Sequence, residues 1–239
     1  MFIELPEILV CPHCRPRREE ASLQGLVAVV EEMADRTVLR GCLGCAECDA
    51  RYRIEGGCVH FGAAPGGRAQ AGGSQAAAPA GGRESASARR ADGKQESPAE
   101  LAVRVAALLS FQESPRYVLL GRGLSEAAAH LARLAIGTEI VLLTDVIPGA
   151  MPPGPGMTRL TGVSEGCLPF RSGRIQGVAL RGGRPAALAE ASRVLEPGGR
   201  LAVLRPELRE GEEGVRAILE GAGLRLLACD ARAAVAERA

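Results

Sequence analysis

The chain of 239 residues is long enough for one large domain or two small ones, and its formal net charge is only +1. This balance gives no overall attraction to nucleic acid or to an anionic membrane, and the 3% aromatic content disfavours a base-stacking surface. No apolar run approaches the roughly 18 residues of a membrane span. The first residues, MFIELPEILVC, lack the basic start and cleavage site of a signal peptide. We therefore expect a cytoplasmic protein without a membrane segment.

Composition divides the chain into three segments. Residues 1–61 hold six of the eight cysteines. Residues 62–97 contain no Val, Ile, Leu, Met, Phe or Tyr, so they cannot bury enough apolar surface to offset the entropy of ordering. They are predicted to form a disordered Ala/Gly-rich linker that spans roughly 30–35 Å. Residues 98–239 alternate strand-like with helix-like runs and are predicted to form a second domain.

Two C-x-x-C pairs stand in the first segment, Cys11 with Cys14 and Cys45 with Cys48. In a reducing compartment such pairs favour metal over disulfides, and two tight turns can point four thiolates at one zinc ion. A closed shell of four sulfurs leaves no position for a substrate, so the predicted zinc site is structural and supplies folding energy to a small domain. The alternative is a set of buried, reduced cysteines.

The other cysteines and the histidines carry weaker signals. Cys42 and Cys58 are predicted to pack as small apolar residues, although either could replace a zinc ligand. His13 and His60 are expected at the surface. Residues 23–32 and 36–41, between the two cysteine pairs, are predicted to form two strands of a hairpin.

The first segment resembles the small zinc-ribbon proteins that partner and activate methyltransferases of tRNA, rRNA and release factors. The shared features cover nearly all of residues 3–61: Leu5, the run Ile8-Leu9-Val10-Cys11-Pro12, Gly41-x-Leu43-x-Cys45, and Tyr52-x-Ile54 followed by Gly57. Arg53 and Val59 stand where that family usually has prolines. The resemblance implies a zinc-ribbon domain at 1–61 whose apolar surface pairs with a methyltransferase domain.

The third segment reads as an α/β domain. Ser97 is the expected N-cap of a helix that has Pro98 at its first position. Strands are predicted at 117–120, 139–145, 158–163, 175–180 and 200–205, helices at 125–135, 185–195 and 211–223, and a closing hairpin at 224–238. Alternating strands and helices imply right-handed crossovers and a mostly parallel sheet with an antiparallel end hairpin. Pro197-Gly198-Gly199 is predicted to turn the chain into the fifth strand.

Residues 98–239 resemble a class I S-adenosylmethionine-dependent methyltransferase, and so a Rossmann-like domain. The strongest matches are CLPFRSGRIQGVAL, from Cys167, and ALAEASRVLEPGGRLAVLRP, from Ala187. The resemblance implies cofactor-binding roles for Gly121 and Gly123 in the first turn, for Asp145 toward the ribose hydroxyls, and for Leu168 in an apolar loop.

The third segment also departs from the methyltransferase pattern. Leu119 replaces the usual carboxylate before the first turn, and Ser125 replaces a third glycine. Val163 and Gln176 stand where acidic residues are common. The proline-rich stretch after Asp145, VIPGAMPPGPGMT, excludes the helix expected there.

Two functions follow from these observations. The departures favour a methyltransferase-like protein with a structural zinc ribbon that serves as a non-catalytic or weakly cofactor-binding interaction subunit, with a protein partner held by either domain. The alternative is an active S-adenosylmethionine-dependent methyltransferase acting on RNA, protein or a small molecule, for which the sequence nominates no catalytic base. Whether the chain meets nucleic acid is left open by the sequence.

Overall fold

The computed structural model of the protein describes residues 1–17, 23–62, 96–111, 116–145, 154, 156–204 and 211–239. Its elements follow in chain order: η1 (Leu5–Glu7), η2 (Arg15–Arg17), β1 (Val27–Ala34), β2 (Thr37–Gly44), β3 (Arg51–Glu55), β4 (Cys58–His60), α1 (Pro98–Leu108), β5 (Tyr117–Leu120), α2 (Ser125–Leu134), β6 (Glu139–Leu143), β7 (Met157–Thr161), β8 (Ile175–Arg181), α3 (Pro185–Val194), β9 (Leu195–Leu204), α4 (Gly211–Gly221), β10 (Leu224–Cys229) and β11 (Ala233–Arg238). Most of the predicted linker and most of the proline-rich stretch after Asp145 lie outside the described residues. None of the helices described is long and apolar enough to cross a membrane.

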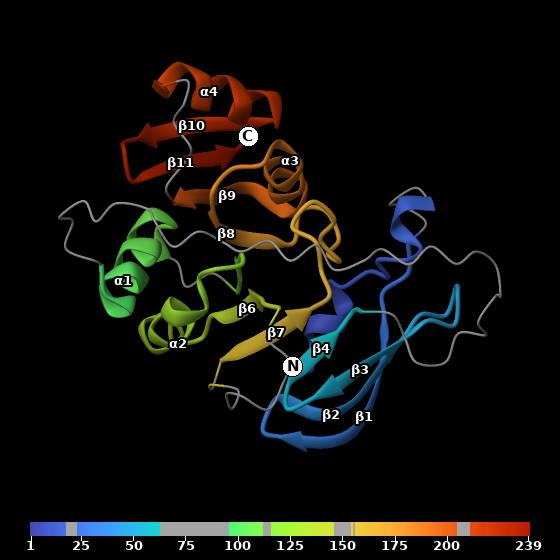
Figure 1. Cartoon of the computed structure of the whole chain (residues 1–239). Coiled ribbons are helices and arrows are strands. Elements are labelled where there is room, and N and C mark those ends of the chain that lie inside the picture. Colours follow the sequence, from blue (N-terminus) through green and yellow to red (C-terminus); the bar gives the residue numbers. More distant parts are fainter. Residues whose placement is uncertain (18–22, 63–95, 112–115, 146–153, 155, 205–210) are drawn as a thin grey trace, which may run out of the picture.

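All eleven strands belong to one mixed sheet with the order β1-β2-β3-β4-β7-β6-β5-β8-β9-β11-β10. From β4 to β9 the neighbouring strands are parallel, whereas β1 to β4 form an antiparallel meander and β11 runs antiparallel to both β9 and β10. The predicted parallel centre, the end hairpin and the hairpin between the cysteine pairs are thus all present. The N-terminal strands and the C-terminal hairpin occupy opposite ends of the sheet (Figure 1).

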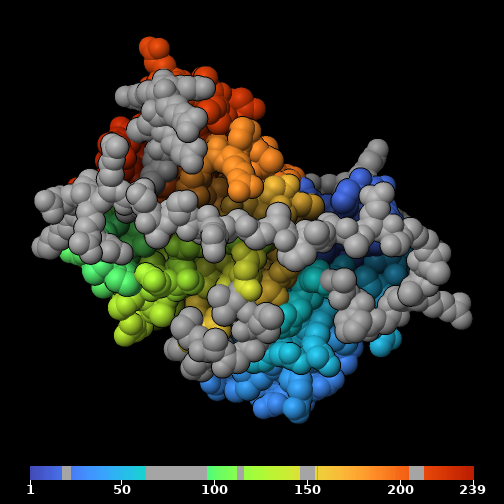
Figure 2. Space-filling model, in the orientation of Figure 1, coloured from blue at the N-terminus to red at the C-terminus, as the bar shows by residue number. Residues whose placement is uncertain are grey.

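The N-terminal strands continue the sheet of the third segment. Strand β4 pairs in parallel with β7, so that Val59 lies opposite Leu160 and His60 opposite Thr161. The backbone N–H of Phe61 extends the ladder by donating to the Thr161 carbonyl at 2.9 Å. Figure 2 shows the blue and cyan surface of residues 1–62 in direct contact with the yellow surface of β7. The division at residues 61 and 97 stays a prediction, but the strands on its two sides share one sheet.

Helices cover both faces of the parallel strands because successive strand residues point to opposite sides. Val118 and Leu120 of β5 join the apolar cluster that includes α1 and α2, whereas Leu119 joins the cluster that includes α3. Helix α1 begins as expected: the Ser97 hydroxyl accepts from the Glu100 N–H, and the Glu100 carboxylate accepts from the Ser97 N–H.

The N-terminal segment packs on the connection between β7 and β8. Residues 162–174 of that connection form no helix. The N–H of Val10 donates to the Pro169 carbonyl at 3.0 Å, and the N–H of Arg171 donates to the Ile8 carbonyl at 2.9 Å. Leu9 and Phe170, which both have no exposed surface, pair between these bonds. The N-terminal segment and the connection therefore belong to one apolar cluster with residues of the sheet.

The Pro197-Gly198-Gly199 turn lies inside β9 rather than before it. Ile175 pairs with Leu195, but Gly177 pairs with Arg200, so residues 196–199 leave the ladder. Gly198 has φ of +78°, which glycine adopts without strain. The turn thus has the predicted chemistry, although strand β9 starts five residues earlier than expected.

Candidate metal centre and cofactor cleft

The four predicted zinc ligands come together. The sulfur atoms of Cys11, Cys14, Cys45 and Cys48 all lie within 4.8 Å of one another. The Sγ atoms of Cys11 and Cys48 are 3.6 Å apart, and those of Cys14 and Cys45 are 3.8 Å apart. Among the described residues, these four form the one group of three or more side chains that could hold a metal ion.

Local backbone turns aim each pair of sulfurs at this centre. The N–H of Arg15 bonds the Cys11 carbonyl at 3.0 Å, which tightens the chain around the first pair. The N–H of Asp49 bonds the Cys45 carbonyl at 3.0 Å around the second pair, and Asp49 has a positive φ of 56°. The tight turn around each cysteine pair is therefore formed by hydrogen bonds of the backbone itself.

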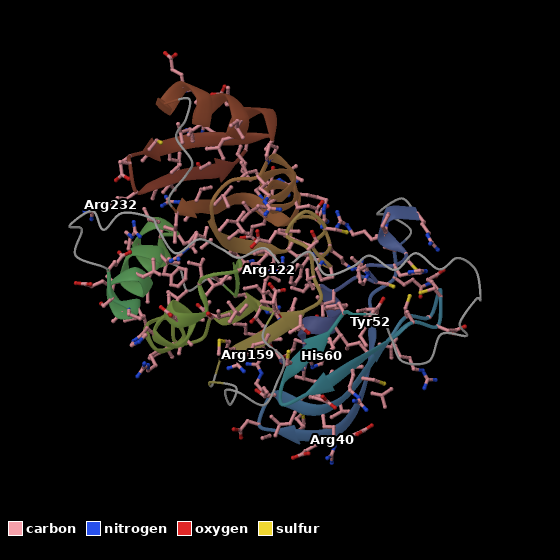
Figure 3. All side chains as sticks on the ribbon, viewed as in Figure 1. Arg40, Tyr52, His60, Arg122, Arg159 and Arg232 are labelled. Carbon is pink, nitrogen blue, oxygen red and sulfur yellow. The ribbon has the colours of Figure 1, made fainter. Side chains whose placement is uncertain are left out.

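The hydroxyl of Tyr52, on β3, reaches the metal centre from the side. It lies 3.0 Å from the Cys11 sulfur, and Figure 3 shows it beside the sulfur atoms of this region. Burial opposes ionisation of Cys11, but the bonds from Tyr52 and from the Cys14 and His13 N–H groups hold the pKa of the Cys11 thiol below its usual value. Burial raises the pKa of the Cys14 thiol. A bound dication would ionise both thiols.

The cysteine cluster fits zinc. A tetrahedron with Zn–S bonds of about 2.3 Å has sulfur–sulfur edges of about 3.8 Å. The distances of 3.6 and 3.8 Å match this edge. Three of the four cysteines are also at least nine-tenths buried, so four thiolates without an ion would lack compensation. Zinc held here would be closed to substrate and would act on the fold.

The remaining candidates of the first segment lie elsewhere. Cys42 is half-buried in β2 and Cys58 is buried in β4, and neither joins the four-sulfur group. His13 is exposed as expected. His60 is half-buried rather than exposed, because its position on β4 faces the neighbouring strand; its Nδ1 atom lies 2.9 Å from the Thr161 hydroxyl.

At the carboxyl end of β5 the glycine turn has the predicted form. Gly121 follows the strand directly, and Gly123 has φ of +77°. A Cβ atom at residue 121 would lie 2.8 Å from both the Glu165 carboxylate and a Leu180 methyl group. Glycine is therefore needed at this position because the chain's own side chains crowd it.

Arg122, between the two glycines, ties the turn to its neighbours. Its N–H donates to the Glu165 carboxylate at 2.8 Å, and its guanidinium donates to the Val163 carbonyl at 2.5 Å. Its Nε atom lies 2.9 Å from a carboxylate oxygen of Asp145. Figure 3 places Arg122 near the middle of the molecule, over the parallel strands. The Asp145 side chain is 71% exposed, yet its charge is already paired.

The positions that depart from the methyltransferase pattern do not all face this turn. Leu119 is fully buried in the core, and Val163 is 5% exposed. Gln176 lies near the start of β8, so it is at the amino ends of the parallel strands, whereas the glycine turn is at their carboxyl ends. Its side chain accepts from the Tyr117 N–H at 2.8 Å and donates to Glu196 at 2.7 Å. Gln176 thus has a structural role that explains it without reference to a cofactor.

Leu168 lies in the interface with the N-terminal segment. Its side chain is 1% exposed, its N–H donates to Glu190, and its carbonyl accepts from Arg15 and Arg193. Arg15 also forms an ion pair with Glu190, and both side chains are mostly buried. Burial opposes ionisation of Glu190, but hydrogen bonds from Arg193 and Arg15 keep the pKa of its carboxyl below the usual value.

Sequence reasoning placed Gly121, Gly123 and Asp145 at one edge of the sheet, and the structure brings these three together around Arg122. It did not single out Arg122, Glu165 or Arg15. The position of Arg122 could have indicated its role. A long cationic side chain between Gly121 and Gly123 can reach across the turn to the Asp145 carboxylate. No local pattern marked Glu165 or Arg15, whose partners are distant in sequence.

Neither a protein-family model nor a curated protein matches the chain. Similar solved structures include a Burkholderia thailandensis 1,6-didemethyltoxoflavin-N1-methyltransferase with bound 1,6-didemethyltoxoflavin and S-adenosylhomocysteine (17% identity, 60% of this chain, 79% of that chain, TM-score 0.48). They also include the CcbJ methyltransferase from Streptomyces caelestis (18% identity, 59% of this chain, 89% of that chain, TM-score 0.46). A third is the [4+2]-cyclase SpnF (18% identity, 54% of this chain, 58% of that chain, TM-score 0.44). The neighbours thus include methyltransferases and a cyclase, and at these TM-scores they carry no argument about activity.

Proposed function

We propose that the protein is a methyltransferase-like, Rossmann-like scaffold stabilised by a structural zinc ribbon, with an interaction role in place of methyl transfer. One observation carries this proposal: Arg122 and Glu165 fill the turn where a cofactor would bind. Arg122 forms an ion pair with Asp145, the candidate ribose ligand, and the Glu165 carboxylate accepts a hydrogen bond from the backbone N–H of Arg122. A cofactor would have to displace both side chains.

The strand order supports the methyltransferase-like part of the proposal. Counted within residues 98–239, the strands follow the order third, second, first, fourth, fifth, seventh, sixth, and only the seventh is antiparallel. Gly121 and Gly123 lie at the carboxyl edge beside the point where the order reverses, which is where open α/β sheets bind ligands.

The ribbon has its own apolar partner in this chain. Strand β4 pairs with β7, Leu9 with Phe170, and Arg15 with Glu190. The surface that would recruit a separate methyltransferase domain is thereby occupied in cis. We infer that any protein partner uses other surfaces, and that the four free thiols of the metal site require a reducing compartment, the cytoplasm.

Active methyl transfer is the second candidate. It is favoured by the retained glycines and by Asp145, whose exposed side chain could exchange Arg122 for a ribose. If S-adenosylmethionine bound, it would supply the methyl group, and Gly121, Gly123 and Asp145 would position it.

Calorimetric titration of the zinc-loaded protein with S-adenosylmethionine separates the two candidates. The scaffold proposal expects no saturable binding below about 100 µM, roughly 5.5 kcal/mol. Binding at low micromolar concentration would overturn it in favour of the enzyme. The Asp145→Asn variant is the matched control for ribose recognition: if S-adenosylmethionine binds with its ribose on Asp145, this variant should lose the binding.

A further inference from the structure

A cavity of about 690 Å³ opens at the carboxyl edge of the sheet, beside the glycine turn and apart from the metal centre. It extends from Arg122 over the ends of β8 and β9 and between α3 and α4. This volume is within the usual range of small-molecule sites, roughly 300–1,000 Å³. The cavity lies on the β8 side of β5, next to the point where the strand order reverses.

The rim of the cavity carries more positive than negative charge. Among the residues that the structure describes, three arginines line it, Arg122, Arg181 and Arg184, together with one carboxylate, that of Glu165. Arg122 and Glu165 are already engaged with their neighbours. Within the part of the chain that the structure describes, neither Arg181 nor Arg184 has an ion pair or a hydrogen bond from its guanidinium. Two arginines that line the cavity thus have no ion-pair partner among the described residues.

The backbone adds to this positive edge. Arg181 ends β8, and Gly182 and Gly183 lead directly to Arg184, the N-cap of α3. No side chain caps the start of this helix, which begins with Pro185. The partial positive charge of a helix start is therefore added to the two guanidinium groups at the same rim.

The floor of the cavity is apolar. It is formed by Leu188 of α3, Val203 of β9, and Val215, Ile218 and Leu219 of α4. Ile218 is 38% exposed, although it lies on a helix that packs on the sheet. An apolar body in the cavity would cover this surface and gain free energy from its burial.

We propose that this cavity binds a small amphipathic anion: a carboxylate or phosphate group held by Arg181 and Arg184, with an apolar body against α3, α4 and β9. The guanidinium geometry suits both oxyanions, which it can bind in a bidentate manner. The site adjoins the self-filled turn and shares Arg122 and Glu165 with it, but the proposed anion ligands Arg181 and Arg184 take no part in filling the turn. A scaffold with this site would be responsive to a metabolite of that class.

The test uses the full, zinc-loaded chain and the fluorescent probe 8-anilinonaphthalene-1-sulfonate, which is itself an anion with an apolar body. Displacement of the probe is measured with octanoate, octyl phosphate, octanol and octylammonium. We expect both anions to displace the probe at concentrations about ten-fold below those of octanol and octylammonium. Stronger displacement by octanoate identifies a carboxylate ligand, and stronger displacement by octyl phosphate identifies a phosphate ligand.

One variant removes positive charge at the carboxyl end of β8, where the cavity lies, and its control removes positive charge at the amino end of the same strand. The double variant Arg181→Met, Arg184→Met keeps the side-chain stems and should weaken octanoate or octyl phosphate binding about ten-fold. Arg174→Met, just before the start of β8, should leave it unchanged. Equal displacement by octylammonium, or unchanged anion binding in the double variant, overturns the proposal. These exposed substitutions leave the core intact, and a melting curve of each variant verifies its fold.

Discussion

The metal centre was predicted from the spacing of its cysteines and the cofactor cleft from a resemblance to methyltransferases, and the structure arranges the two sites differently. At the metal centre, four sulfurs lie within 4.8 Å of one another, and two of the distances between them, 3.6 and 3.8 Å, match the edge of a zinc tetrahedron. At the cleft, Gly121, Gly123 and Asp145 also converge, but they converge on Arg122 of the same chain, and the fourth predicted residue, Leu168, packs against the N-terminal segment instead. Correct placement of ligand residues is thus insufficient evidence for a ligand, because the same residues can satisfy one another.

The largest expected effect comes from breaking the metal centre. If the proposed zinc is bound, Cys45→Ser should abolish stoichiometric zinc and lower the melting temperature by about 10 °C or more, because the ion would supply much of the folding free energy of the N-terminal segment. Elemental analysis under reducing, non-chelating conditions should find one zinc per wild-type chain. Cys42→Ser is the control, since Cys42 is outside the four-sulfur group. Wild-type protein without zinc would refute the prediction.

A second variant tests how firmly the ribbon is joined to the third segment. Glu190→Gln leaves Arg15 mostly buried without its partner and should cost about 3 kcal/mol in the free energy of unfolding. Denaturant unfolding measures this loss. Glu55→Gln, which removes one partner of an exposed pair with Arg53, should change stability by less than about 0.5 kcal/mol. Equal effects of the two variants would contradict the interface described here.

The same carboxyl group predicts a pH dependence. The pKa of Glu190 is lowered in the folded protein, so the unfolded chain binds more protons between the two pKa values. The contribution of Glu190 is therefore complete at neutral pH and is lost as the pH falls below about 4.3, the ordinary Glu value. The stability difference between wild type and Glu190→Gln should shrink below that pH. If this stability difference instead grew as the pH fell, the pKa of Glu190 would not be lowered in the folded protein.

Tyr52→Phe sharpens the description of the metal centre. Loss of the hydroxyl bond to Cys11 should weaken zinc binding about ten-fold, as observed for groups that orient metal ligands. Competition with a chromophoric chelator measures the affinity. Tyr117→Phe removes a hydroxyl far from the four cysteines and should leave zinc affinity unchanged. An unchanged affinity in Tyr52→Phe would mean that the hydroxyl does not support the thiolate.

The smallest effect is expected at the cleft. Asp145→Asn removes an ion pair whose side chains are 38% and 71% exposed, so the free energy of unfolding should fall by less than about 1 kcal/mol. A thermal melt measures the change. A loss above about 2 kcal/mol would show that the pair holds the fold together and does more than fill the cleft.

Local signals predicted much of the fold. Short apolar runs that alternate with helix-like runs identified the strands and helices of residues 98–239, and the Ser97 cap and the Gly198 turn have the expected chemistry. The pairing of β4 with β7 could not be derived from local patterns, because it joins Cys58 to Arg159 across the predicted linker. Spacing likewise identified the four cysteines that the structure brings together, since each pair lies within one tight turn.

The cleft was harder to predict because its state depends on side chains from different strands. Glu165 follows β7 and Arg122 follows β5, and their contact is fixed only when the parallel strands are aligned. The role of Gln176 could not be predicted from its sequence position either, because its amide links β5 to Glu196 through residues that are distant in sequence.

The most direct test of the self-filled cleft is a pair of calorimetric titrations with S-adenosylmethionine, on the zinc-loaded wild type and on the double variant Arg122→Ala, Glu165→Ala. If Arg122 and Glu165 fill the turn, we expect no saturable binding of S-adenosylmethionine to the wild type below about 100 µM. Binding to the double variant should be at least about ten-fold tighter, because the turn is then open. Low-micromolar binding to the wild type, or identical behaviour of the two proteins, would contradict a self-filled cleft.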